Sequence, residues 1–225
     1  RNAYIDADFL KYEVPFAAVA SWRMFKEEQG IVNDSLPSVD RVIDSLEAKV
    51  SSMLLASESS NPVFFFTGAE NFRETLATTR KYKDRPEVSP PHKDNVVAYI
   101  KGKWDWEVHP KLEADDLLAI ALTNDPNAIC LTRDKDLLQV PGWHYQWETT
   151  SYPSLGPLLV EGYGHLEWDV ERNKVFGYGD KFFFLQCLMG DSTDTIPGLP
   201  KIGVKKALKM LIDTNTYEEG LEVVV

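Results

Sequence analysis

The sequence predicts an α/β protein with a parallel-rich central sheet flanked by helices. Three short, continuous apolar runs have the composition of strands buried on both faces: Ala3–Ile5, Val63–Phe66 and Ala128–Thr132. Segments with helical spacing of apolar residues alternate with these runs, at residues 15–28, 39–55 and 113–122. Strands and helices that alternate along a chain are typical of a parallel sheet covered by helices.

Local signals set the bounds of the first two helices. The spacing predicts a helix over Pro15–Glu28, with Gly30 as its stop. The next helix covers Val39–Leu55, and either Ser38 or Asp40 can cap its N-terminus. Both helices therefore precede the second predicted strand.

The middle of the chain combines a loop with two more helices. Residues 85–91 contain three prolines and are expected to form a loop, and residues 95–100 a short helix. The helix at residues 113–122 carries an apolar stripe and ends at Asn124–Pro126.

The last third is less regular. Residues 151–179 are rich in glycine, proline and aromatic residues, and we expect a loop with a short hairpin. A core helix is predicted at residues 182–189, a tight turn at 196–203 and a final helix at 204–212. The chain lacks an initial Met and ends on an apolar run, so the natural protein is expected to be longer.

Composition bounds the class of protein. The 225 residues can bury a substantial core, and no apolar run approaches the roughly 20 residues that span a bilayer. The net charge of −11 argues at first against a nucleic-acid partner. However, residues 201–209 hold four lysines and no acid, and residues 80–111 hold eight basic against five acidic residues. Such local patches, and not the total charge, decide contact with phosphates.

The cysteines and histidines suggest no metal site of their own. Cys130 and Cys187 both lie in apolar surroundings, so we expect two buried, reduced cysteines and a cytoplasmic location. The four histidines show no ligand spacing.

Acidic residues cluster where predicted elements start or stop. These residues are Asp6, Glu113, Asp115, Asp116, Asp134, Asp136, Asp191 and Asp194. Each cluster alone is explained by a helix N-terminus or a charged turn. Four clusters together favour one shared site, because ligands bind at the carboxyl ends of parallel strands, where Asp6 and Asp134 fall. An all-carboxylate site selects Mg²⁺ or Mn²⁺, and this many carboxylates suit two ions.

Three ordered motifs resemble the 5′-nuclease, or flap endonuclease, family. The motifs are Leu112–Asp116, Leu131–Leu137 and Gly190–Gly198. The family includes the 5′-nuclease domain of bacterial DNA polymerase I and phage 5′–3′ exonucleases. The resemblance implies a PIN-like domain with a C-terminal helix–turn–helix DNA-binding element. It also implies a magnesium-dependent, two-metal hydrolase that cuts DNA at 5′ ends, flaps or branches during replication and repair.

The resemblance also implies residue roles. Asp6, Glu113, Asp115 and Asp134 would be the inner metal ligands, and Asp116, Asp136, Asp191 and Asp194 would complete the site. Lys83 would contact the scissile phosphate, and Arg73, Tyr82 and Arg85 would bind DNA nearby. Gly198, Gly203, Lys205 and Lys206 would bind duplex DNA at the helix–turn–helix, with K⁺ held there. The expected partner is DNA, or RNA in RNA–DNA hybrids, bound by a monomer.

The resemblance implies a domain organisation and shows one departure. Residues 1–185 would form the nuclease core with a short gateway at about 80–111, and residues 186–225 the duplex-binding region. The family usually has an Asp after the second strand, where this chain has Thr67. Glu70 is the nearest acid that could supply the carboxylate instead.

Two other functions remain open from the residues alone. Asp6 and Asp8 after a strand resemble the nucleophile and general acid of a haloacid-dehalogenase-type phosphatase. That assignment leaves the acids at 113–116 and the lysines at 205–206 without a role. The other alternative is a DNA-binding protein with a weakened catalytic site, which the missing Asp suggests.

Overall fold

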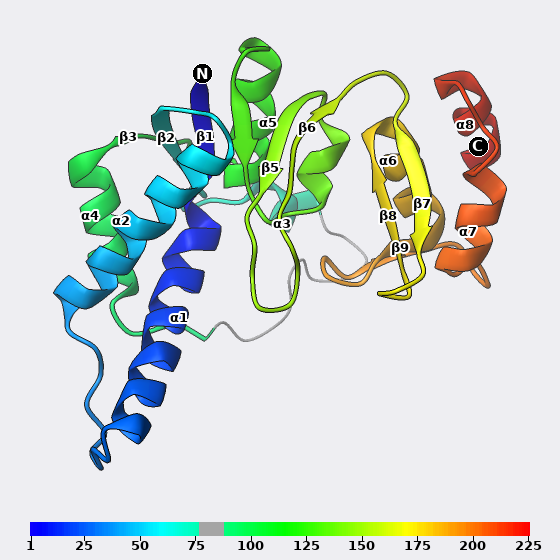
Figure 1. The fold of residues 1–225 in the computed structure, drawn as a ribbon. Coiled ribbons are helices and arrows are strands. Elements are labelled where there is room, and N and C mark those ends of the chain that lie inside the picture. The colour runs from blue at the N-terminus through cyan, green and yellow to red at the C-terminus, as the bar shows by residue number, and fades with distance from the viewer. Residues whose placement is uncertain (77–87) are drawn as a thin grey trace.

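A six-stranded sheet forms the centre of the fold, in the computed structural model that describes residues 1–76 and 88–225 (Figure 1). The strand order is β3-β2-β1-β4-β5-β6. The strands are β1 (Asn2–Asp6), β2 (Asn61–Phe66), β3 (Asp105–Val108), β4 (Ile129–Leu131), β5 (Gly142–Gln146) and β6 (Leu155–Val160). All neighbours pair in parallel except β6, which is antiparallel to β5. The predicted α/β class with a mostly parallel sheet is confirmed.

Helices cover both faces of this sheet, which explains the continuous apolar runs. The helices α1 (Ala7–Glu28), α2 (Val39–Ala56) and α4 (Lys93–Lys103) share one core with Phe64 and Phe66. Helix α5 (Ala114–Asn124) packs on the opposite face with Phe65. Because successive side chains of a strand point to opposite faces, a strand buried on both sides needs an apolar residue at every position.

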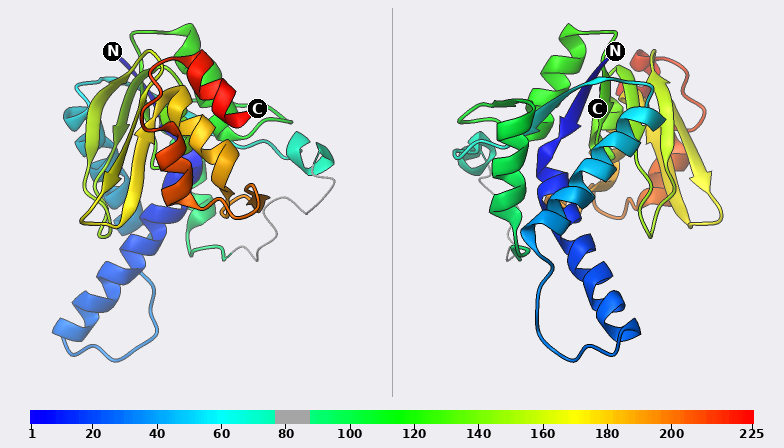
Figure 2. Two further views of the ribbon diagram at one scale, coloured as in Figure 1. Left: turned by 90° about the vertical axis from the view of Figure 1, so that its right-hand side faces the viewer. Right: turned by 60° about the vertical axis from the view of Figure 1, so that its left-hand side comes forward.

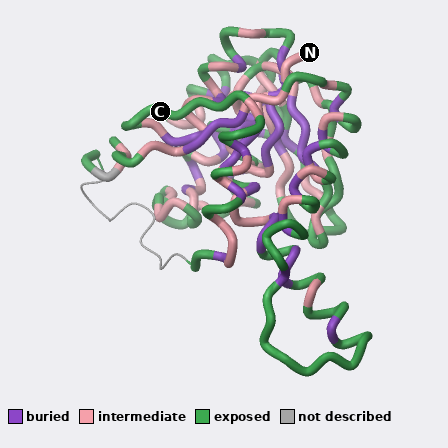
Figure 3. Tube along the Cα trace, turned by 90° about the vertical axis from the view of Figure 1, so that its left-hand side faces the viewer, coloured by how far each residue is buried: buried purple, intermediate pink, exposed green. Residues whose placement is uncertain are grey.

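Helix α1 starts earlier than the sequence predicted. It begins at Ala7, directly after β1, because the Asp6 carboxylate accepts a hydrogen bond from the Phe9 backbone N–H at 3.1 Å and so caps the helix. Pro15 lies inside the helix and does not start it. The far end of α1 and the loop at residues 29–38 project away from the sheet (Figure 2), and most of this arm is exposed (Figure 3).

A second, smaller core is formed by the C-terminal part of the chain. It contains the hairpin β7 (His165–Asp169) and β8 (Lys174–Tyr178), with the helices α6 (Gly179–Met189), α7 (Val204–Leu211) and α8 (Tyr217–Val224). The short strands β9 (Gly190–Asp191) and β10 (Ile196–Pro197) pair between α6 and α7. The boundary predicted between residues 185 and 186 falls inside α6.

Several local expectations were wrong or incomplete. Residues 151–179 contain three strands and not a loop with one hairpin, since β6 extends the main sheet. The predicted gateway at 80–111 includes α4 and the edge strand β3, which belong to the core fold. Cys187 is exposed, because it lies one turn after the exposed Phe183 on the solvent-facing side of α6, whereas Cys130 is buried as expected.

The remaining elements are the short helix α3 (Phe72–Leu76) and a 3₁₀ turn at Asp136–Gln139. Within the described ranges, no helix is long and apolar enough to cross a bilayer.

Candidate active site

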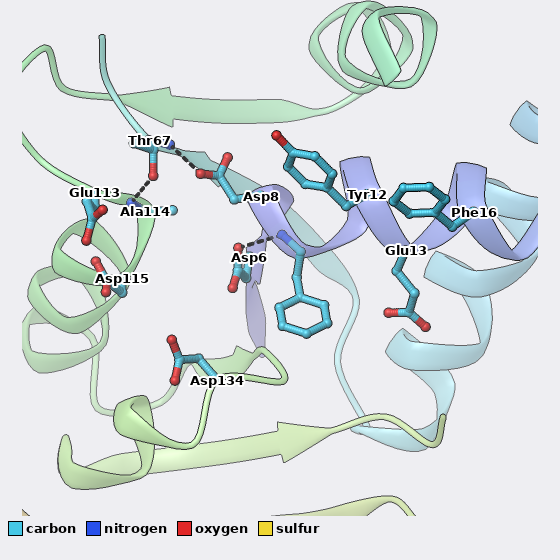
Figure 4. Close-up of a pocket in the computed structure, with 11 residues that line it drawn as sticks. Asp6, Asp8, Tyr12, Glu13, Phe16, Thr67, Glu113, Ala114, Asp115 and Asp134 are labelled. Atoms are coloured by element: carbon cyan, nitrogen blue, oxygen red, sulfur yellow. Dashed lines mark hydrogen bonds between the residues drawn. The ribbon is translucent and has the colours of Figure 1, made fainter. Parts of the chain in front are cut away.

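Six carboxylates line one open pocket of about 550 Å³ at the carboxyl ends of the central strands (Figure 4). Five belong to Asp6, Asp8, Glu113, Asp115 and Asp134, and the sixth belongs to Glu13 of α1, which accepts hydrogen bonds from Lys49 and Trp147. Asp6 ends β1, Asp134 follows β4, and Glu113 precedes α5. The pocket therefore lies where the sequence predicted a ligand site.

Asp6 is one of the two buried carboxylates of the pocket, with Glu113 as the other. One oxygen accepts the Phe9 N–H, and the other accepts the Thr132 hydroxyl at 2.8 Å. Burial, followed by repulsion from Asp8 and Asp134, raises the pKa of Asp6 to about 7. A bound cation would relieve this repulsion.

Asp134 is held by the turn that follows β4. Its backbone N–H donates to the Thr132 hydroxyl at 3.0 Å, and its side chain accepts the Asp136 N–H at 2.9 Å. Burial raises the pKa of Asp134, and repulsion from Asp136 and Asp194 raises it further. The buried Thr132 hydroxyl thus joins the two carboxylate-bearing strand ends, β1 and β4.

Glu113 and Asp115 enter the pocket from the start of α5. Glu113 is the N-cap residue and forms a reciprocal capping box with Asp116, whose side chain accepts the Glu113 N–H at 3.0 Å. The Asn71 side-chain amide donates to Glu113 at 2.8 Å. Burial, and then repulsion from Glu113, raises the pKa of Asp115 to about 6.

Arg73 neutralises part of this charge. Its guanidinium forms two hydrogen bonds of 2.6 and 2.7 Å to Asp116 and lies 3.4 Å from Glu113. The hydrogen bonds to Asp116 raise the pKa of Arg73 above its usual range. The structure thus places Arg73, expected on DNA, against predicted metal ligands.

The remaining predicted ligands lie beside the pocket and not in its lining. The Lys135 ammonium lies 2.7 Å from both Asp136 and Asp191, and the Gln186 amide donates to both carboxylates. Asp194 contributes negative charge near Asp134. The structure therefore brings four of the eight predicted ligands into the pocket lining.

Thr67 occupies the strand end where an Asp was expected. Its hydroxyl accepts the Ala114 N–H at 3.0 Å, and its N–H donates to Asp8 at 3.3 Å (Figure 4). Asp8 therefore brings a carboxylate to the end of β2 from the first turn of α1. Glu70 is exposed and does not line the pocket, so it does not replace the missing residue. The Asp6-x-Asp8 spacing was the sequence signal for this arrangement.

The predicted DNA-binding residues lie in two regions. Tyr82, Lys83 and Arg85 lie outside the described residues. Lys205 and Lys206 are exposed on the first turn of α7, after Gly203. A side chain at Gly198 would meet the Met189 carbonyl oxygen at 2.2 Å, so this glycine is required by close packing, whereas Gly203 faces open space.

The donor chemistry of the pocket fits a hard divalent cation. Its ionisable lining groups are carboxylates, apart from the Tyr12 phenol, and the pKa of Asp6 is raised first by burial and then by repulsion from Asp8 and Asp134. Within the described residues, however, no three carboxylate, imidazole or thiol groups are close enough to hold one ion together. The ligand set therefore stays a prediction.

Two curated proteins are related to the chain in sequence, although no family model matches it. DNA polymerase I of Bacillus subtilis (strain 168) is 28% identical over 173 residues, covering 71% of this chain and 18% of the polymerase. The 5′–3′ exonuclease of Buchnera aphidicola subsp. Schizaphis graminum is 30% identical over 159 residues, covering 66% of this chain and 51% of the exonuclease. These relatives confirm the resemblance to 5′-nucleases that the sequence motifs indicated. It spans about half or less of the length of these two relatives.

Solved structures of 5′-nucleases share the fold. T5 5′-exonuclease with bound divalent metal ions (zinc) aligns with a TM-score of 0.55 at 13% identity, covering 100% of this chain and 84% of the exonuclease. The catalytic core of Rad2 in complex with DNA substrate aligns with a TM-score of 0.51 at 16% identity, covering 99% of this chain and 64% of that core. At these identities the likeness concerns the fold of the family.

Proposed function

We propose that the protein is a divalent-metal-dependent 5′-nuclease that hydrolyses phosphodiester bonds at 5′ ends, flaps or branches of DNA. The observation that carries this proposal is the convergence of six carboxylates on one pocket, five of them near the ends of β1, β2 and β4. Sequence relatives named as a 5′–3′ exonuclease and as DNA polymerase I support it. They also favour it over the phosphatase alternative.

The pocket residues divide the work between ligands and supports. Asp6, Glu113, Asp115 and Asp134 would hold Mg²⁺ or Mn²⁺, with the other four predicted acids completing the site for a second ion. Two such ions, when bound, would activate water and stabilise the leaving oxygen. Thr132 fixes the Asp6 and Asp134 ends of the site through its two hydrogen bonds. Arg73 balances the charge of Asp116 so that Asp115 can face the pocket.

DNA would reach the pocket along the surface formed by the turn before α7 and by α7 itself. From Thr195 to Ile212 the chain has four lysines and no acidic residue, in a protein with a net charge of −11. We extend the proposal to a helix–turn–helix made of α6, the turn at residues 198–203 and α7, with K⁺ held in the turn. Lys83, Tyr82 and Arg85 keep their proposed contacts with the DNA near the scissile bond.

The test is a digest of 5′-labelled flap, nicked, gapped and blunt DNA, and of an RNA–DNA hybrid, with Mg²⁺ and with EDTA. Wild type is expected to release 5′ products only with the metal. Asp134→Asn keeps the oxygen that accepts the Asp136 N–H but removes the charge, so it is expected to bind DNA and cut at least a hundredfold more slowly, on the order of the loss of one electrostatic group.

The control is Asp44→Asn, which makes the same chemical change on the exposed surface of α2 and is expected to cut like wild type. Equal cutting by Asp134→Asn and wild type would overturn the site assignment. Binding of DNA without cutting by wild type would instead identify a DNA-binding protein with a weakened site.

A further inference from the structure

A groove separate from the carboxylate pocket lies between β7 and α7, which Figure 1 shows side by side. Its volume is about 360 Å³, and its lining is Trp168, Lys205, Leu208, Lys209 and Ile212. Lys205, Leu208 and Lys209 lie on one face of α7, and Ile212 is the residue that caps its C-terminus. None of the five lines the carboxylate pocket.

Trp168 forms the apolar wall of this groove. It shares a face of β7 with Leu166, which is fully packed against α6 and α7. Trp168 lies two residues further along, at the rim of that core, and it stays partly exposed. The indole ring therefore faces both the core and the solvent above α7.

Two ammonium groups border the groove on α7. The Lys205 ammonium lies 5.0 Å from the centre of the Trp168 ring, so the indole holds this charge at the groove. Lys209 lies one turn further along the same face and is exposed. Within the described residues neither lysine forms an ion pair with a carboxylate.

The chemistry of the groove fits one ligand class. An apolar aromatic wall suits the faces of a sugar, and ammonium groups one helical turn apart suit successive phosphates. An acidic protein partner would supply negative charge for the two lysines but no sugar rings to pack against Trp168. The sugar–phosphate backbone of nucleic acid supplies both.

We propose that Trp168, Lys205 and Lys209 contact the backbone of duplex DNA, so that the hairpin β7–β8 extends the DNA-binding surface beyond α7. The inference rests on the proposed function, because it takes DNA as the partner. It adds Trp168 and Lys209 to the contacts, and it assigns Lys205 a position fixed by an aromatic ring.

The experiment measures equilibrium binding in EDTA, where no cutting is expected, by fluorescence anisotropy of a labelled long blunt duplex and of the matching single strand. Trp168→Ala is expected to weaken duplex binding roughly five- to tenfold, as for loss of one aromatic contact, while Trp168→Phe stays near wild type. Lys209→Ala is expected to weaken binding and to lower the slope of log Kd against log salt by about one.

The matched control is Trp106→Ala. Trp106 is 40% exposed on β3, an edge strand of the six-stranded sheet, and the Lys101 ammonium lies 4.4 Å from its ring, so the same kind of pair stands away from the β7–β8 hairpin. This variant is expected to bind the duplex like wild type. Circular dichroism of each variant establishes that the fold is retained, and Trp168→Phe and Lys209→Ala test the contact even if Trp168→Ala unfolds.

Wild-type affinity in both Trp168→Ala and Lys209→Ala would overturn the inference, as would an equal loss of single-strand and duplex binding. The outcome is separable from the proposed function. A protein that binds the duplex through Trp168 but never cuts would overturn the nuclease activity alone. A protein that cuts normally with no effect of Trp168 or Lys209 on binding would overturn this contact alone.

Discussion

The Thr132 hydroxyl offers the sharpest test of how the pocket is held together. The residue is 1% exposed, and its hydroxyl donates to Asp6 at 2.8 Å while accepting the Asp134 N–H at 3.0 Å. Thr132→Val replaces the hydroxyl with a methyl group of similar size. The substitution therefore removes both hydrogen bonds without opening a cavity.

The expected cost follows from those two bonds. A hydrogen bond to a charged acceptor such as Asp6 contributes about 1.5 to 3 kcal/mol, and a buried donor left unpaired at Asp134 costs about 1 to 3 kcal/mol. The added methyl group returns about 0.8 kcal/mol through apolar burial. We expect the free energy of unfolding to fall by about 2 to 5 kcal/mol, which corresponds to a decrease in Tm of roughly 4 to 20 °C in a chain of this length.

Urea unfolding in EDTA, followed by circular dichroism, measures this change, and calorimetric titration with Mn²⁺ measures the cation affinity. Thr132→Ser is the matched control, because it keeps the hydroxyl and loses only a methyl group, at a cost of about 1 kcal/mol. Wild-type stability and Mn²⁺ affinity in Thr132→Val, or a larger loss in Thr132→Ser, would refute the role of the hydroxyl.

Two further predictions concern charge and backbone packing. Because the pKa of Asp6 is about 7 in the folded, metal-free protein and about 4 when unfolded, the folded state binds the extra proton, so stability should fall as pH rises from about 4 to 7. Unfolding in EDTA across this pH range measures the slope of the free energy of unfolding against pH. Asp6→Asn should make this slope smaller, and a wild-type stability that does not change with pH would contradict the prediction. A methyl group on Gly68 would lie 2.0 Å from the His109 carbonyl oxygen. Gly68→Ala should therefore lower the free energy of unfolding by about 1 to 3 kcal/mol and Tm by several degrees. Gly102→Ala, in open space on α4, is its control and should be neutral or stabilising by up to about 1 kcal/mol.

The sequence identified the centre of the sheet because burial on both faces leaves a clear mark. The apolar runs at β1, β2 and β4 were recognised for that reason. Strand β5 was not, because its sequence Gly-Trp-His-Tyr-Gln mixes polar and apolar residues, although His144 and Tyr145 are buried. The bounds of the hairpin β7–β8 could not be predicted, because its glycines and aromatic residues give no alternating pattern and find their packing partners only in the tertiary fold.

For the site, the sequence predicted positions better than pairings. Acids at strand and helix ends were recognisable, and Asp6, Glu113, Asp115 and Asp134 do meet in one pocket. The ion pairs that Arg73 and Lys135 make depend on how distant segments pack, which no local pattern reveals.

Asp6 and Glu113 each serve twice, since each is a proposed ligand and also the N-cap residue of a helix. This double role affects how inactive variants can be interpreted. An alanine at either position would remove the cap as well as the charge, so the stability and the proposed activity would both fall and their causes could not be separated. An amide keeps an oxygen that can accept the capping N–H bond, so Asp6→Asn and Glu113→Gln separate the two effects. A bound cation would also draw on oxygens that hold the first turns of α1 and α5, so metal occupancy and the order of these helix starts should change together.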